Sequence, residues 1–148
     1  MDASARRGAP AGAAHGGHLR LLGESGPDAP PVLALDGEFD IDTVPEIDRF
    51  LRRRLGPLYH RRHLVIDLAG ATFIDSSFIG FLVRLTGQQR ATHRELVLAR
   101  PEGQVRRLLG LVGLPNVVPV FDSLDEALAA LADDRLPVIP PAFSVAPR

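Results

Sequence analysis

The most constraining feature of this sequence is a short apolar run followed closely by a helical pattern, with a serine between them. Residues 64–68 (LVIDL) are apolar at four of five positions, which is typical of a β-strand covered on both faces. From Ile79 onward, apolar residues recur at the spacing of a helix. Asp75 or Ser76 is the expected N-cap of that helix. The pattern therefore predicts a strand that delivers a serine hydroxyl to a helix N-terminus.

Two interpretations of Ser76 follow from that position. The first N–H groups of a helix lack partners within the helix, and its dipole adds about half a positive charge, so a phosphate on Ser76 could be accommodated there. Alternatively, Ser76 is a capping residue and nothing more. The chain has neither a Gly-x-Ser-x-Gly nor a Walker-type motif, and its five histidines are scattered. We therefore do not expect a hydrolase or a nucleotide-hydrolysing enzyme.

Strand and helix signals alternate along the chain. Two short strands, at residues 18–22 and 32–35, are separated by a Gly- and Pro-rich segment and are expected to pair antiparallel. Thr43 and Glu46 have the spacing of a capping box at the start of the first helix. Strands joined through helices run parallel. The predicted fold class is α/β, with a mixed sheet that is mostly parallel after its first hairpin. The further strands are predicted at residues 64–68, 95–99 and 117–121, and the helix faces at Ile47, Phe50, Leu51 and Leu55, at Ile79, Leu82 and Val83, at Val105, Leu108, Leu109 and Val112, and at Leu124, Ala127, Leu128 and Leu131.

The composition agrees with one globular domain and two flanking tails. The 148 residues are 45% hydrophobic, enough for a core of their own. We predict a disordered N-terminal tail at residues 1–17, the domain at residues 18–134 and a proline-rich C-terminal tail at residues 135–148. The absence of cysteine excludes disulfides and thiolate metal sites, and no apolar stretch is long enough for a membrane helix. Arginine clusters and the His60/His63 pair are interpreted as solvated surface.

Several segments, in the right order, carry a family resemblance. Residues 65–77 (VIDLAGATFIDSS) end with an aspartate–serine pair, residues 37–40 (GEFD) precede a helix, and residues 105–114 and 120–128 close the domain. This pattern resembles the STAS family, the domain of bacterial anti-sigma factor antagonists. The resemblance covers residues 18–134. It implies a STAS-type mixed sheet of four to five strands with an N-terminal antiparallel hairpin and about four helices.

The resemblance also implies a role for the serine site. Ser76 corresponds to the serine that an anti-sigma factor kinase phosphorylates, and Ser77 to its neighbour, the less favoured acceptor. The unphosphorylated protein would bind that kinase and release a sigma factor, and phosphorylation would end the binding. Asp40, Asp75 and Ser77 are the implied partner-binding residues. Alternatively, Asp40 is a turn carboxylate that helps start the following helix.

One residue departs from the family pattern. The serine pair is usually followed by glycine, but here Phe78 follows. Phe78, Phe81 and Leu85 form a stripe displaced from the predicted core face of the helix. We therefore predict that Phe78 and Phe81 contact a partner. The alternative is that Phe78 packs against the Asp40 loop or the C-terminal tail.

The implied protein is a cytoplasmic regulator of transcription in a stress response, not an enzyme, and it needs no cofactor or metal. Its partners would be an anti-sigma factor with serine-protein kinase activity and a phosphatase. No direct contact with nucleic acid or membrane is expected, and the chain would be a monomer or weak dimer. The second interpretation is an accessory STAS module of a transporter or signalling complex that is not phosphorylated. A small nucleotide-binding or hydrolytic protein is the third.

Overall fold

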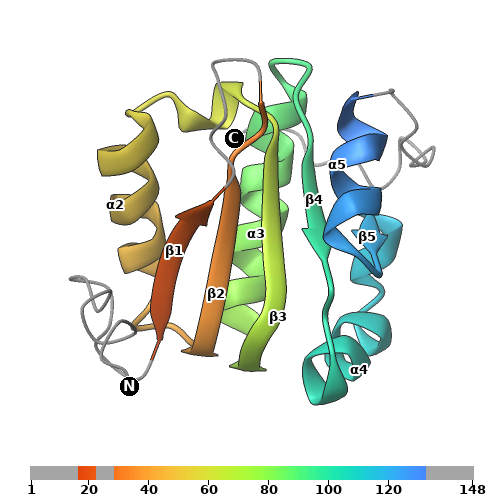
Figure 1. Ribbon diagram of the computed structural model, residues 1–148. Helices are drawn as coiled ribbons and strands as arrows, with labels where there is room; N and C mark the ends of the chain where they lie inside the picture. Colours follow the sequence, from red (N-terminus) through yellow and green to blue (C-terminus); the bar gives the residue numbers. More distant parts are fainter. Residues whose placement is uncertain (1–16, 23–28, 133–148) are drawn as a thin grey trace.

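The computed structural model describes residues 17–22 and 29–132. Within these ranges one five-stranded sheet has the order β1-β2-β3-β4-β5 (Figure 1). The first two strands pair antiparallel and every later pair is parallel, as predicted. The predicted tails lie outside the described residues, except for Gly17, and the domain limits 18–134 stay a prediction. The elements are β1 (His18–Leu22), β2 (Val32–Phe39), α2 (Val44–Leu55), η2 (Tyr59–Arg61), β3 (Leu64–Ile74), α3 (Ser76–Arg90), β4 (Leu96–Ala99), α4 (Gly103–Leu111), η3 (Leu114–Asn116), β5 (Val120–Phe121) and α5 (Leu124–Ala132).

The sheet carries helices on both faces, because its strands alternate apolar side chains between the two sides. Leu33, Ile66 and Leu98 belong to the large core with α2, α3 and α4. Val65 and Val97 point the other way and pack with α5. Figure 1 shows α3 behind the sheet and α5 in front of it. Burial on both faces explains the apolar run in β3.

The central strands are longer than predicted. β2 continues to Phe39 and β3 to Ile74, and these two last residues are paired in the parallel register. The register shifts twice along this pair, between Ala34 and Asp36 and again at Gly37. These irregularities interrupt the simple apolar pattern, which is why the sequence signal for both strands stopped early. As a result, the segments that follow β2 and β3 leave the sheet side by side.

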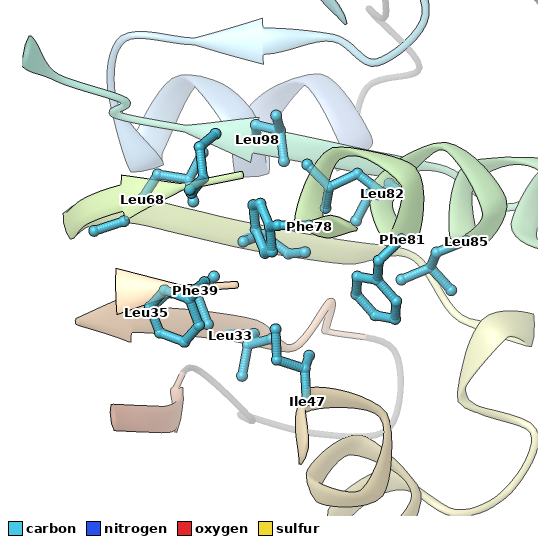
Figure 2. Close-up of a cluster of buried hydrophobic side chains, with 14 of the residues drawn as sticks. Leu33, Leu35, Phe39, Ile47, Leu68, Phe78, Phe81, Leu82, Leu85 and Leu98 are labelled. Carbon is cyan, nitrogen blue, oxygen red and sulfur yellow. The ribbon is translucent and has the colours of Figure 1, made fainter. Parts of the chain in front are cut away.

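Helix α3 buries a broader surface than its sequence indicated. Phe78, Phe81 and Leu85 are buried together with Leu82, whereas Ile79 is half-buried. Figure 2 shows Phe78 and Phe81 pointing from α3 into the core. The helix is covered by the sheet on one side and contacts α2 on its flank, so the stripe of Phe78, Phe81 and Leu85 is covered as well.

Candidate functional site

Ser76 is the first residue of α3, and its side chain does not cap the helix. The cap is Asp75, whose Oδ1 accepts hydrogen bonds from the backbone N–H groups of Ser77 (2.9 Å) and Phe78 (3.1 Å). Such a cap satisfies two of the donors that a helix start otherwise leaves open. Ser76 itself is exposed. Its hydroxyl is therefore available for other chemistry.

The loop after β2 is organised by Asp40. Its Oδ1 accepts hydrogen bonds from the backbone N–H groups of Asp42 (3.0 Å) and Thr43 (3.2 Å). The interpretation of Asp40 as a turn carboxylate is thus confirmed. The predicted capping box is wrong, because Thr43 has helical backbone angles and its Oγ1 accepts from the Asp40 N–H (2.7 Å) instead of capping α2. Asp40 and Thr43 together form a closed turn that starts the helix.

The sheet register brings the two loops to one edge. Asp40 follows Phe39 and Asp75 follows Ile74, and Phe39 and Ile74 are paired neighbours on parallel strands. Asp40, Asp75 and Ser76 therefore share the edge of the sheet where β2 and β3 end, at the bottom of Figure 1. Asp42 adds a further exposed carboxylate in the same loop. The serine lies at an acidic edge.

The sequence matches one known protein family. A family model described as "Mlab, STAS domain" matches residues 22–119, about two-thirds of the chain. The chain belongs to the STAS domain family. The predicted mixed sheet with an N-terminal antiparallel hairpin and four described α-helices is the fold of that family.

Solved structures share this STAS fold. An anti-sigma factor antagonist from Mycobacterium paratuberculosis is 24% identical with a TM-score of 0.63, over 84% of this chain and 99% of that one. The Bacillus antagonist SpoIIAA in its unphosphorylated form is 19% identical with a TM-score of 0.55, over 79% and 96%. The murine solute carrier 26 family member A9 anion transporter is 13% identical with a TM-score of 0.62, over 79% of this chain and 22% of the transporter. These similarities show the fold.

Phe78 does not present its ring to a partner in this STAS domain. Its side chain is 0% exposed, and its ring centroid lies 6.0 Å from that of Phe39, the residue before Asp40. Phe81 is buried too. The prediction that these two side chains contact a partner is therefore wrong. The aromatic ring fills the core beneath the serine site, beside the start of the Asp40 loop.

Other apolar side chains are exposed around the same edge. Ile41 in the Asp40 loop is 67% exposed, Phe73 before the site is 42% exposed, and Leu111 at the end of α4 is 78% exposed. Phe73 and Leu111 line one open cavity of about 220 Å³. None of these three exposed side chains was predicted from the sequence. For Leu111 a signal existed, since it falls off the apolar face of α4 that Val105 defines.

Among the described residues, no histidine or carboxylate is hydrogen-bonded to the Ser76 hydroxyl. Among residues 17–22 and 29–132, His60 and His63 precede β3 and His93 follows α3, at the end opposite Ser76, whereas His18 begins β1 and is paired with Asp36 of β2, toward the end where β2 leads to Asp40. The same ranges hold no cluster of histidine and carboxylate side chains suited to a metal ion. No helix in the described part of the chain combines the length and the apolar character required to span a bilayer. The site therefore presents an exposed serine hydroxyl at the edge where β2 and β3 end.

Proposed function

We propose that this STAS domain is an anti-sigma factor antagonist controlled by phosphorylation of Ser76. In this proposal the unmodified protein binds an anti-sigma factor with serine kinase activity in the cytoplasm, so that a sigma factor is released. It acts by binding and carries out no catalysis of its own. The observation that carries the proposal is the exposed Ser76 hydroxyl at the start of α3, left free because Asp75 caps the helix.

A phosphate at Ser76 would change the contact surface without changing the fold. It adds a charge of about −1.5 to −2 next to Asp75, at an edge already acidic through Asp40 and Asp42. Where the partner's surface supplies no cation to this charge, burying it at the interface costs several kcal/mol, and each 1.4 kcal/mol is a factor of ten in affinity. One modification would therefore weaken binding by orders of magnitude. SpoIIAA, which shares this fold, is known in both unphosphorylated and phosphorylated forms.

The proposed contact surface combines polar and apolar residues. Asp40, Asp75 and Ser77 surround the serine, and Ile41 and Phe73 add exposed apolar area beside them. Exposed apolar side chains rimmed by charged ones are typical of protein–protein contact sites. Phe73 takes the anchoring role that the buried Phe78 cannot have.

The test is phosphopeptide mapping by mass spectrometry of the protein from its own cells, across growth and stress. We expect phosphate on Ser76 in amounts that vary with condition. In calorimetric titrations with the kinase, Ser76→Ala should keep its affinity when ATP is added, whereas wild type and Ser77→Ala should lose it. Absence of phosphate under every condition, or a Ser76→Ala variant that still responds to ATP, would contradict the proposal.

A second candidate function is an accessory module that binds a transporter or signalling complex without being phosphorylated. It is favoured by the similarity in fold to part of the murine anion transporter. The same mapping experiment separates the two, because this module would carry no phosphate and Ser76→Ala would bind like wild type.

A further inference from the structure

One arginine lies on the helix stripe that Ser76 begins. Ser76, Gly80 and Arg84 are spaced by four residues in α3, so they follow one another along one line of the helix surface. The Arg84 guanidinium bends back along this line toward the N-terminus. Its Nη1 lies 3.3 Å from the point that a Cβ atom on Gly80 would occupy. The cation therefore covers Gly80, one turn from Ser76.

We infer that Arg84 binds the phosphate of phosphorylated Ser76, through the space that Gly80 leaves free. This inference rests on the proposed function, since it concerns the modified form of the same site. Cβ positions four residues apart on a helix are separated by about 5–6 Å. The phosphate extends from Ser76 into that gap from one side, and the guanidinium already occupies the other. A charge-assisted hydrogen bond of about 2.7–2.9 Å then closes the distance.

Two of the N–H groups in the first turn of the helix are not free to bind the phosphate. The Ser77 and Phe78 N–H groups already donate to Asp75. The Asp75 carboxylate also repels a phosphate on the adjacent residue, and Asp40 adds a further negative charge at this edge. A phosphoserine in these surroundings needs a cation from elsewhere. Arg84 is the arginine that α3 places on the stripe of Ser76.

Arg84 is positioned but not engaged. Its side chain is exposed, and it makes no hydrogen bond or ion pair with the described residues, unlike Arg52 with Asp48 (2.9 Å) or Arg106 with Asp122 (2.7 Å). It lines a groove of about 300 Å³ together with Pro45 and Asp48 of α2, and that carboxylate is already bonded to Arg52 and Tyr59. An arginine without a carboxylate partner can bind a new anion without first breaking an ion pair.

The experiment installs phosphoserine at position 76 of the full chain by genetic code expansion, so that no kinase is required. The second pKa of the phosphate, ordinarily near 6, is then read from ³¹P chemical shifts between about pH 4.5 and 8. A nearby cation favours the dianion, so Arg84 lowers this pKa. We expect the wild-type value to lie about 0.3–0.5 pH unit below that of Arg84→Gln. Gly80→Met, which displaces the guanidinium but keeps the charge, should titrate like Arg84→Gln.

Two matched variants test the specificity of this contact. Arg53 is exposed in the last turn of α2. Arg107 of α4 lines the same cavity as Phe73. Arg53→Gln and Arg107→Gln should both titrate like wild type. Equal pKa values for wild type and Arg84→Gln would overturn the inference, and so would a rise confined to Arg107→Gln.

These results are independent of the test of the proposed function. The phosphoserine is incorporated during translation and needs no kinase, so equal pKa values for wild type and Arg84→Gln would exclude the role of Arg84. Whether cells phosphorylate Ser76 would still be decided by the mapping experiment. Conversely, absence of phosphate in cells would remove the proposed function, while the titration would still report whether Arg84 contacts the phosphate.

Discussion

The two ends of α3 differ in how they are attached to the rest of the domain. At the C-terminal end, the buried Gln89 donates through Nε2 to the backbone oxygens of Arg62 (2.6 Å) and Glu95 (3.4 Å). Arg90 donates to the Val117 oxygen (2.7 Å) and forms an ion pair with Glu95 (3.3 Å). At the N-terminal end, Asp75 bonds only to its own helix. One end thus holds loops in place, and the other leaves Ser76 exposed.

The C-terminal end of α3 therefore has a structural role, and its N-terminal end is available to a partner. Side chains that bond to backbone groups far away in sequence fix the position of α3, and removing them lowers the free energy of unfolding. A local cap such as Asp75 fixes only the first turn, so the surface around it can change its chemistry without loosening the fold. The phosphorylation proposed for Ser76 uses the end that carries no tertiary hydrogen bonds among the described residues.

The largest effect is expected at Phe78, which lies at the N-terminal end of α3 but is buried. Phe78→Ala should lower the free energy of unfolding by about 3–5 kcal/mol, because it leaves a cavity in the core beside Phe39. Urea denaturation followed by circular dichroism measures this loss. Phe73→Ala is the control, and it should cost about 1 kcal/mol or less because Phe73 is partly exposed. Equal losses in the two variants would mean that Phe78 is not a core residue.

At the other end, Gln89→Ala should lower the free energy of unfolding by about 1–3 kcal/mol, since it removes the donor to the backbone oxygens of Arg62, which is distant in sequence, and of Glu95 in the loop after α3. The neighbouring Gln88 is exposed, which makes Gln88→Ala a matched control with an expected change within about 0.5 kcal/mol. Thermal and urea denaturation provide the measurement. If both variants unfold like wild type, the hydrogen bonds of Gln89 at the C-terminal end of α3 do not stabilise the domain.

The smallest effect is expected at Ser76. Ser76→Asp should shift the unfolding free energy by no more than about 0.5 kcal/mol, because the side chain is exposed and is not the cap. Asp75→Ala, at the adjacent position, should cost about 1 kcal/mol through loss of the cap. A large loss of stability in Ser76→Asp would show that the serine has a structural role, and would weaken the contrast between the two ends.

The order and type of the elements could be predicted from periodicity, and so could several helix ends. Gly113 has a left-handed φ of 74°, as expected for a glycine just after a helix, and Ser123 Oγ accepts from the Glu126 N–H (3.0 Å) as a capping serine does. Asp40 and Asp75 were also found from the sequence, since short polar residues between a strand and a helix have few other roles.

The remaining features depend on tertiary contacts that no local pattern encodes. Thr43 and Glu46 have capping-box spacing, but Thr43 bonds back to Asp40 because the loop closes on itself. Phe78 lies off the face predicted for the core, and only the position of α3 over the sheet and beside α2 reveals that it is buried. The exposure of Ile41 likewise follows from the shape of its loop, not from its residue type.

The burial of the residues that flank Ser76 determines how another protein can recognise it. Ile74 ends a central strand and Phe78 is enclosed in the core, so the chain on either side of the serine cannot be drawn out into an extended peptide while the domain stays folded. An enzyme that modifies Ser76 must dock on the intact surface and take its specificity from side chains of several segments, not from a linear consensus. The proposed phosphorylation site is thus a feature of the folded domain, which an isolated peptide with the same residues would not reproduce.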